Sequence, residues 1–161
     1  MMAHMPNTAF RRATSGDASL LRSLAQRCPP LDVHTHYTYW TITEYFGDLC
    51  AVAEVDGTPV GFATAVLRGD RGLLWQVGVL PAYRTQGVGS ALLTLVAARL
   101  EEHGVRRLEV SIAPDNVASH ATLFRLAEDR GVEVVHQGDV DLHDLADPSF
   151  TEFEHRYVIT L

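Results

Sequence analysis

The chain lacks the long apolar run that a membrane-spanning helix needs. No stretch of its 161 residues approaches about 18 consecutive apolar residues, and the opening segment, MMAHMPNTAF, lacks the apolar core of a signal peptide. Cysteine is scarce as well. Cys28 and Cys50 lie far apart and show no CxxC or Cys/His spacing, so we expect incidental buried thiols rather than a disulfide or a zinc site. These absences favour a cytoplasmic protein.

Basic charge is also in short supply. The chain has 13 Lys and Arg residues against 20 Asp and Glu residues, which gives a net charge of −7. This balance argues against sequence-independent binding of nucleic acid, which needs a basic surface. It leaves an anionic ligand open, because backbone N–H groups can bind phosphate without any lysine. The eight histidines form no H-x-x-H or H-E-x-x-H cluster, so the sequence predicts no metal site.

Apolar residues, in contrast, are plentiful enough for one sizeable core. They make up 47% of the chain, and we expect one domain over residues 1–161. Residues 1–6 are expected to be disordered, so the fold argument begins after Met5. Neither a repeat nor a linker is visible in the sequence.

Apolar periodicity predicts alternating strands and helices. The expected strands cover residues 8–13, 50–67 as a hairpin turning at Asp56-Gly57, 73–80, 107–112, 133–136 and 153–161. Four helices are expected. The first follows the cap TSGD at 14–17, the second ends near Gly47, the third runs from Val88 to Gly104, and the fourth covers 117–130 behind the N-cap Asn116. Residues 138–149, GDVDLHDLADPS, are rich in Asp and are expected to form an acidic loop.

Residues 73–80, LLWQVGVL, form an almost continuous apolar run. Such a run is typical of a strand that is covered on both faces. A strand, a helix and another strand follow one another from residue 73 to residue 112. This order implies a parallel pair joined by a right-handed crossover.

The segment between that strand and the next helix has the pattern Arg84-x-x-Gly87-x-Gly89. A helix that begins near Val88 would present the free N–H groups of residues 86–90 and the positive end of its dipole. The two glycines remove side chains that would hold a ligand away, and Arg84 adds a full charge. The pattern predicts a cradle for a diphosphate. It is neither a Walker A loop nor a G-x-G-x-x-G fingerprint.

This pattern, with a hairpin before it and Asn116 and the run Ala121 to Phe124 after it, resembles the acetyl-CoA signature of the GNAT superfamily. The resemblance implies an α/β (α+β) fold with a central, mixed, mostly antiparallel, twisted sheet of about six or seven strands, a splayed parallel pair and about four flanking helices. It also implies that acetyl-CoA is the cosubstrate and that its pantetheine arm pairs with the strand near Val77 and Val79. The implied cofactor-binding residues are Val77, Gly78, Val79, Arg84, Thr85, Gln86, Gly87, Val88, Gly89, Ser90, Asn116 and Phe124.

Phe124 departs from the superfamily pattern. Many relatives place a tyrosine there, which can reprotonate the leaving thiolate, and phenylalanine cannot do this. Either water or another group supplies the proton, or coenzyme A leaves as a thiolate. The departure also leaves open a sensor that binds acetyl-CoA without turning it over.

Several short stretches are similar to the diaminobutyrate acetyltransferases of ectoine biosynthesis. They are PLDVHTHY from Pro30, VAE from Val52, LWQVGV from Leu74, APDNVAS from Ala113 and EHRY from Glu154. The resemblance implies a homodimer that acetylates the side-chain amine of L-2,4-diaminobutyrate. The family usually has Asn-Ser in place of His34-Thr35, and its C-terminal motif differs at residues 151–153. Another small amine therefore stays open as the acceptor: lysine, ornithine, a polyamine or an aminoglycoside.

A diamino acid carries two ammonium groups, so carboxylates should line its pocket. Asp32 and Glu154 are the candidates, and the resemblance adds Thr35, Tyr37 and Trp75 as substrate-binding residues. We expect Glu154, directly or through a water, to take the proton as the amine attacks the acetyl carbonyl. The two cysteines have no base visible in the sequence, which disfavours a covalent route.

Overall fold

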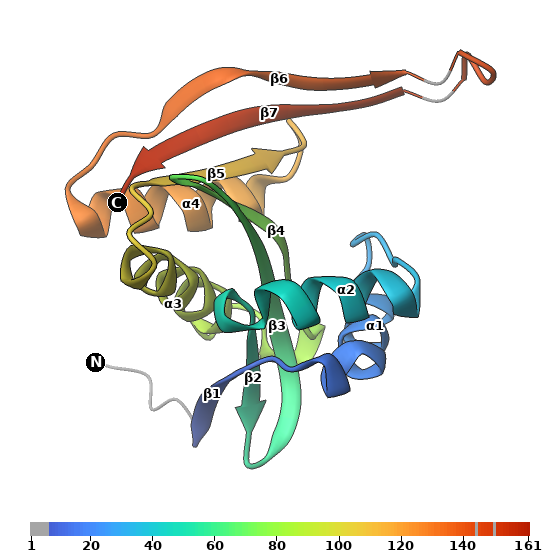
Figure 1. Cartoon of the computed structure of the whole chain (residues 1–161), viewed down its shortest axis with the longest axis vertical. Coiled ribbons are helices and arrows are strands. Elements are labelled where there is room, and N and C mark those ends of the chain that lie inside the picture. Colours follow the sequence, from blue (N-terminus) through green and yellow to red (C-terminus); the bar gives the residue numbers. More distant parts are fainter. Residues whose placement is uncertain (1–6, 144, 150) are drawn as a thin grey trace.

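Seven strands form one sheet (Figure 1): β1 (Thr8–Arg12), β2 (Ala51–Val55), β3 (Thr58–Arg68), β4 (Arg71–Val79), β5 (Arg107–Ile112), β6 (Val135–His143) and β7 (Thr151–Thr160). They lie in the order β1-β2-β3-β4-β5-β7-β6 in the computed structural model, which describes residues 7–143, 145–149 and 151–161. Within those residues β4 and β5 are the one parallel pair, and the other neighbours are antiparallel. The predicted mixed sheet with a parallel pair is therefore confirmed.

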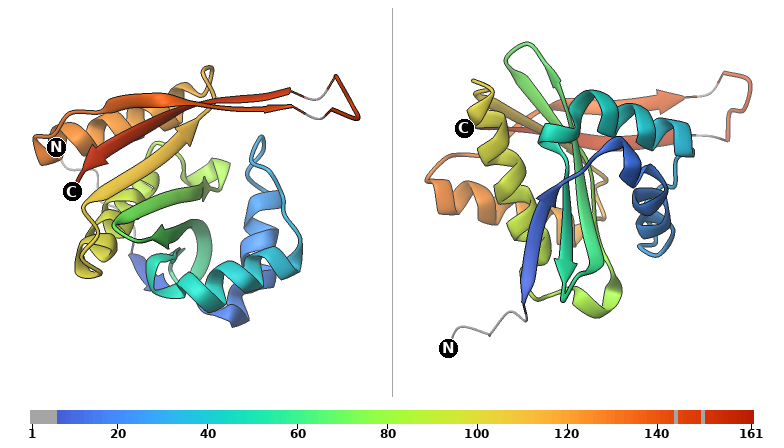
Figure 2. Two further views of the ribbon diagram at one scale, coloured as in Figure 1. Left: turned by 45° about the horizontal axis from the view of Figure 1, so that its top comes forward. Right: turned by 60° about the horizontal axis from the view of Figure 1, so that its bottom comes forward.

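Four α-helices flank the sheet: α1 (Ala18–Gln26), α2 (His36–Phe46), α3 (Val88–Glu102) and α4 (Val117–Arg130). Three short 3-10 helices join them to the strands: η1 (Ser15–Asp17), η2 (Gly47–Leu49) and η3 (Pro81–Tyr83). The helices α1 and α2 pack together on one face, and α3 and α4 pack together on the other (Figure 2). The structure thus has two helical layers with the sheet between them.

The core lies where α1, α2 and α3 cover strands β2 to β4. Its largest fully buried side chains include Leu21 of α1, Tyr39 of α2, Phe62 of β3 and Leu92 of α3. The turn between β2 and β3 explains their tight pairing. Asp56 and Gly57 both have positive φ, 49° and 79°, which a two-residue hairpin turn of the favoured hand requires. The predicted hairpin is confirmed.

The strands β6 and β7 continue beyond the rest of the sheet. His155 is opposite Ile112, the last residue of β5, so the part of β7 before His155 has only β6 beside it. The described residues 139–143 and 151–155 form a two-stranded arm that projects from the body (Figures 1 and 2). The expected strand at 153–161 is confirmed and begins earlier, at Thr151.

The expected acidic loop is wrong over residues 138–143. These residues belong to β6, which begins at Val135 rather than at residue 133. Most side chains of β6 are exposed, so burial of apolar side chains contributes little to this strand. Its backbone pairing with β7 determines its conformation instead.

The expectation that residues 73–80 are covered on both faces is also wrong. Along β4 buried residues alternate with half-buried ones. Because the facing of the side chains changes within the strand, each face is fully covered over only part of its length. The expectation of disorder for residues 1–6 falls outside the described residues. Among the helices of the described residues, none is both long enough and apolar enough to span a membrane.

Candidate active site

The parallel strands β4 and β5 separate halfway along their length. Their pairing runs from Arg71 opposite Arg107 to Leu74 opposite Val110, and in the described part of the chain it stops there. Both strands continue, β4 to Val79 and β5 to Ile112. In the described residues the β4 backbone over residues 75–79 therefore has no strand beside it on the β5 side, although the Val79 carbonyl accepts a hydrogen bond from Arg84 Nε. Such an edge offers N–H and C=O groups to an extended ligand.

A β-bulge in β4 lies at the point of separation. Gln76 is opposite Thr64 of β3 while Leu74 is opposite Ala65, so Trp75 is an extra residue. A bulge shifts the alternation of side chains. Trp75 and Gln76 consequently both face α1 and α2, as their contacts with the loop before α2 and with α2 itself show.

The two glycines of β4 show the same change in the direction that side chains face. A Cβ on Gly72 would meet Leu100 of α3, whereas a Cβ on Gly78 would meet Phe62 at 2.8 Å and Leu31 at 3.1 Å, on the α1 side. Both residues are even-numbered, so the facing has changed between them. Gly78 is thus required by the packing of its own neighbours, in addition to its expected place beside the cofactor.

A buried polar chain fixes the loop that carries Asp32. The Tyr39 hydroxyl donates to Gln76 Oε1 at 3.0 Å, and Gln76 Nε2 donates to the Asp32 carbonyl at 2.8 Å. Tyr39 and Gln76 are both buried, and burial raises the pKa of Tyr39, which keeps the hydroxyl protonated as a donor. The polar chain holds the Asp32 backbone against β4 and leaves the exposed carboxylate beside it.

Trp75 lies beside the loop that carries Asp32. Its ring stacks on His34 with centroids 4.5 Å apart, and it lies 6.3 Å from the ring of Tyr39. The structure therefore brings Asp32 and Trp75 to one region. His34, Tyr39 and Gln76 also belong to this region. The sequence singled out His34 only as a departure from the resembled family, and it missed Tyr39 and Gln76. The signal for Gln76 was visible, because it is the one polar residue in the run LLWQVGVL.

Two expected substrate-binding residues make other contacts. Thr35 is the N-cap of α2, where its Oγ1 accepts a hydrogen bond from the Thr38 N–H at 3.1 Å. Tyr37 is 73% exposed, and its ring stacks on Trp40 with centroids 5.7 Å apart. Neither contact is with Trp75, so the structure does not bring these two residues into the group around it.

Glu154 lies on β7, next to His155, which is opposite the last residue of β5. Leu73, Glu109 and Val158 are opposite one another across β4, β5 and β7, and residues opposite one another point to the same face of a sheet. Alternation along the strands places Trp75 and Glu154 on that same face. Glu154 is half-buried. The two side chains thus point to the same face of the sheet, the face that α1 and α2 cover.

The other face of the gap carries the start of α3. Gly87 is the N-cap of this helix with φ 84°, and Thr85 before it has φ 64°. In the first turn of the helix the Ala91 N–H donates to the Gly87 carbonyl at 3.0 Å. The N–H groups of the preceding turn, including those of Gly89 and Ser90, therefore point out of the helix end. Val88 is buried and anchors this end.

Side chains of the loop stabilise its path. Arg84 Nε donates to the Val79 carbonyl at 3.0 Å and Nη2 to the Pro29 carbonyl at 3.4 Å, although the side chain is exposed. The Thr85 hydroxyl and the Gln86 amide also donate to carbonyls of the loop, at 2.6 and 3.2 Å. At Gly89 a Cβ would lie 3.7 Å from Val79, so the protein itself would accept an alanine there.

The last two expected cofactor-binding residues lie on α4. Asn116 caps the helix, with Oδ1 accepting from the Ser119 N–H at 3.1 Å. Phe124 is 50% exposed, and its ring centroid lies 6.1 Å from that of Tyr157. The Tyr157 hydroxyl in turn lies 3.1 Å from His120 Nε2. A phenol thus packs beside the phenylalanine that replaces the usual tyrosine.

The two cysteines are free and buried, as expected. Burial raises the pKa of Cys50 to about 11 and also raises the pKa of Cys28. A thiol of raised pKa is a poor nucleophile near neutral pH, because the thiolate is the reactive form. This chemistry gives no support to a covalent intermediate on cysteine.

Comparison with known proteins agrees with this geometry. The model of the acetyltransferase (GNAT) family matches residues 19–127. The L-2,4-diaminobutyric acid acetyltransferase of Nocardia farcinica is 39% identical over 134 residues, covering 81% of this chain and 69% of that protein. The enzyme of the same name from Streptomyces coelicolor is 33% identical over 139 residues, covering 83% and 82%.

A solved structure is similar over nearly the whole chain. The diaminobutyrate acetyltransferase EctA from Paenibacillus lautus, in complex with L-2,4-diaminobutyric acid and coenzyme A, has a TM-score of 0.84 and 28% identity, with 97% of this chain and 96% of that chain covered. The ribosomal-protein-S18-alanine N-acetyltransferase from Escherichia coli shares the fold at a TM-score of 0.71 and 19% identity. The chain belongs to the GNAT acetyltransferase family and is an N-acetyltransferase.

Proposed function

We propose that the enzyme moves the acetyl group of acetyl-CoA to the side-chain amine of L-2,4-diaminobutyrate. The observation that carries the proposal is the gap between β4 and β5, with a main-chain anion cradle on one face and an acidic, aromatic surface on the other. The names of the relatives at 33% and 39% identity support the choice of acceptor, as does the ligand of the similar solved structure.

The residues present fit the coenzyme. Acetyl-CoA supplies an activated acetyl group and carries a diphosphate. The N–H groups at the start of α3, over residues 86–90, offer a diphosphate uncharged donors at the positive end of a helix, and Arg84 lies in the same loop. The β4 edge over residues 75–79 offers backbone partners to the extended pantetheine arm. A backbone N–H on this edge also offers a hydrogen bond to the acetyl oxygen as negative charge develops.

The acceptor amine must lose a proton before it attacks. An alkyl ammonium has a pKa of about 10.4, so neutralising it at pH 7 costs about 4–5 kcal/mol. Glu154, directly or through a water, takes this proton as the amine attacks, because its carboxylate is on the acceptor face of the sheet, next to the residue of β7 that is opposite the end of β5. Asp32 is placed to hold the second ammonium group, and the Trp75 ring forms a flat wall that attracts a cation.

The Glu154→Gln variant tests the role of the base. We expect kcat/KM for diaminobutyrate at pH 8 to fall by far more than about threefold, which corresponds to less than 1 kcal/mol of transition-state stabilisation. Glu152→Gln is the matched control, since this half-buried carboxylate is two residues away on the same face of β7. A kcat/KM of Glu154→Gln within threefold of the parent value would contradict the proposed role of Glu154.

A second acceptor has one observation in its favour. His34 stacks on Trp75 and Thr35 caps α2, at the two positions where the resembled family usually has Asn-Ser. The surface beside the gap therefore differs in shape. A panel of diaminobutyrate, lysine, ornithine, a polyamine and an aminoglycoside, followed by release of free thiol, separates these acceptors. Mass spectrometry of the product then identifies the acetylated nitrogen.

The same panel tests whether the protein is an acetyl-CoA sensor rather than an enzyme that turns acetyl-CoA over. A protein that binds acetyl-CoA but releases no thiol with any amine would be a sensor.

We also propose one domain over the whole chain and assembly as a homodimer, on the resemblance to the diaminobutyrate enzymes. Sedimentation of the purified protein over a range of concentrations checks the dimer, because a monomer at every concentration would contradict it.

A further inference from the structure

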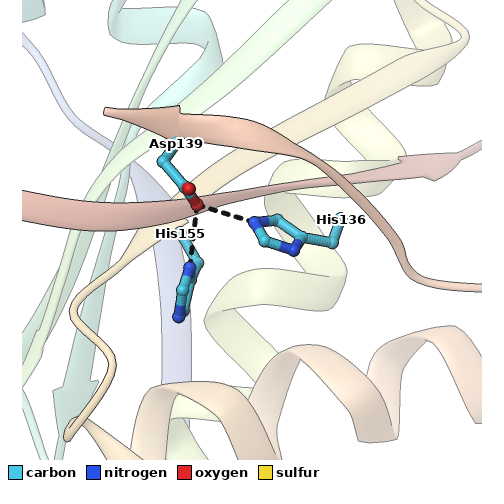
Figure 3. A group of neighbouring side chains, drawn as sticks. All are labelled: His136, Asp139 and His155. Carbon is cyan, nitrogen blue, oxygen red and sulfur yellow. Dashed lines mark hydrogen bonds and ion pairs between the residues drawn. The ribbon is translucent and has the colours of Figure 1, made fainter. Parts of the chain in front are cut away.

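Three side chains converge at the root of the arm (Figure 3). His136 Nε2 lies 2.7 Å from Asp139 Oδ1, and His155 Nδ1 lies 2.8 Å from the same oxygen. The two nitrogens and the oxygen all lie within 4.8 Å of one another. We propose that these residues bind a divalent transition-metal ion of the zinc class, at a site separate from the gap between β4 and β5.

A bulge in β6 creates the convergence. His136 is opposite Tyr157 and Asp139 is opposite His155, so β6 advances by three residues while β7 advances by two. Without the extra residue, His136 and Asp139 would point to opposite faces of the sheet. Gly138 has φ 77° and allows the required backbone. The bulge therefore places all three side chains on one face.

The donor set fits a borderline metal. Imidazole nitrogens and a carboxylate oxygen are ligands that zinc, cobalt and nickel accept, and three protein ligands leave a position for water. Ligand atoms about 2.0–2.2 Å from a tetrahedral ion lie about 3.3–3.5 Å apart. Binding would therefore lengthen the two hydrogen bonds by less than about 1 Å and bring the nitrogens closer together. His136 is exposed and free to move in this way.

Metal binding by these two histidines needs no added base to remove a proton. Each imidazole that now donates its N–H to Asp139 becomes a ligand by moving that proton to its other ring nitrogen, so a neutral histidine releases no net proton. Asp139 is already suited to the role. Its Oδ1 already lies within 2.8 Å of one nitrogen of each imidazole.

The position suggests what the ion would do. His155 is opposite Ile112, where β7 leaves β5 and the arm begins. The His155 ring is flanked by Phe153 and Tyr157, with centroids 5.2 and 6.1 Å away, so one side of the site is apolar. An ion there would join β6 to β7 at the root of the arm, two residues from Asp141 and one from Glu154.

Sequence patterns could not identify this site. The ligands are spaced by three and by sixteen residues, which matches no short metal motif. The expectation of no metal was based on such motifs alone. A second His–Asp pair further along β6 serves as an internal control for the site. There His143 Nε2 is 2.9 Å from Asp141 Oδ1. That pair belongs to no group of three possible ligands among the described residues.

Cobalt binding tests the proposal. The full chain, without an added histidine tag and stripped with a chelator, is titrated with Co²⁺ while its visible d–d absorption is recorded, and bound Co²⁺ is then displaced with Zn²⁺. We expect saturation at one ion per chain. His136→Gln, Asp139→Asn and His155→Gln should each weaken binding about 10-fold or more, whereas His143→Gln should leave it unchanged.

A second readout does not depend on spectra. Zn²⁺ should raise the thermal unfolding midpoint of the parent and of His143→Gln, because an ion bound to the folded state stabilises it. It should not raise the midpoint of His136→Gln, whose exposed side chain can be replaced without loss of folding. Absence of a saturable Co²⁺ signal, or equal weakening by His143→Gln, would overturn the proposal. Neither result bears on acetyl transfer.

Discussion

The gap between β4 and β5 and the arm of β6 and β7 are built in different ways. On the coenzyme face of the gap the groups offered to a ligand are backbone N–H and C=O groups, held by buried apolar side chains such as Val88. At the root of the arm the groups offered to a ligand are exposed side chains held by backbone pairing, as at His136 and Asp139. The two regions meet at Glu154, which points to the acceptor face of the sheet but belongs to the arm.

The comparison shows why the two regions should respond differently to substitution. Near the gap a single change alters a buried hydrogen bond or a required backbone angle. On the arm most side chains can be exchanged without disturbing a neighbour. The predictions below test this difference in order of decreasing effect.

The largest effect is expected at Gln76. Gln76→Leu removes both hydrogen bonds of the buried polar chain and leaves the Tyr39 hydroxyl without its partner. An unsatisfied buried donor costs about 1–3 kcal/mol, so chemical denaturation should show a loss of that size. The Asp32 loop would also lose its tie to β4, and KM for the amine should rise while KM for acetyl-CoA changes little.

Tyr39→Phe is the control for that experiment. It removes the hydroxyl but retains the bond from Gln76 Nε2 to the Asp32 carbonyl. We expect a loss of about 1 kcal/mol in the free energy of unfolding and an unchanged KM for the amine. Equal changes of KM in both variants would show that Gln76 does not position the loop.

An intermediate effect is expected at Gly87. Gly87→Ala must hold an alanine at φ 84°, which costs about 1–2 kcal/mol of stability. Gly104 at the other end of α3 has φ 74° and an open space where its Cβ would lie, so Gly104→Ala should lose a similar amount. Only Gly87→Ala should weaken acetyl-CoA binding in calorimetry, because only this glycine lies in the anion cradle. Equal coenzyme affinity in both variants would argue against the cradle.

The smallest effect is expected at Leu145, near the tip of the arm. This side chain is 97% exposed, and exposed substitutions usually change stability by less than about 0.5 kcal/mol. Leu145→Ser should therefore unfold at the same denaturant concentration as the parent. A clear loss of stability that grows with protein concentration would instead indicate that a second copy covers this residue, and the contrast between the two regions would weaken.

The sequence allowed the gap to be predicted better than the arm, for physical reasons. The turn at Asp56-Gly57, the cap at Asn116 and the left-handed Gly87 are local signals, because each depends on one residue's own backbone preference. The arm has no such signal. Residues 139–143 alternate between polar side chains and the apolar Val140 and Leu142, but the segment is short and acidic, and its strand conformation depends on pairing with a segment that comes later in the chain.

The acceptor surface was predicted in part for a similar reason. Asp32 and Trp75 were expected there, and the structure brings them together through Gln76. The bulge that turns Trp75 towards α2 depends on the register between β3 and β4, which no periodicity in β4 alone can reveal. The cap made by Thr35 and the outward stacking of Tyr37 on Trp40 also depend on where α2 begins.

A crystal structure with coenzyme A bound tests the central claim most directly. The account predicts that the diphosphate oxygens lie within hydrogen-bond distance of the backbone N–H groups of residues 86–90, with the pantetheine arm along the β4 edge over residues 75–79. A diphosphate bound elsewhere, with the loop before α3 making no contact to it, would contradict the account.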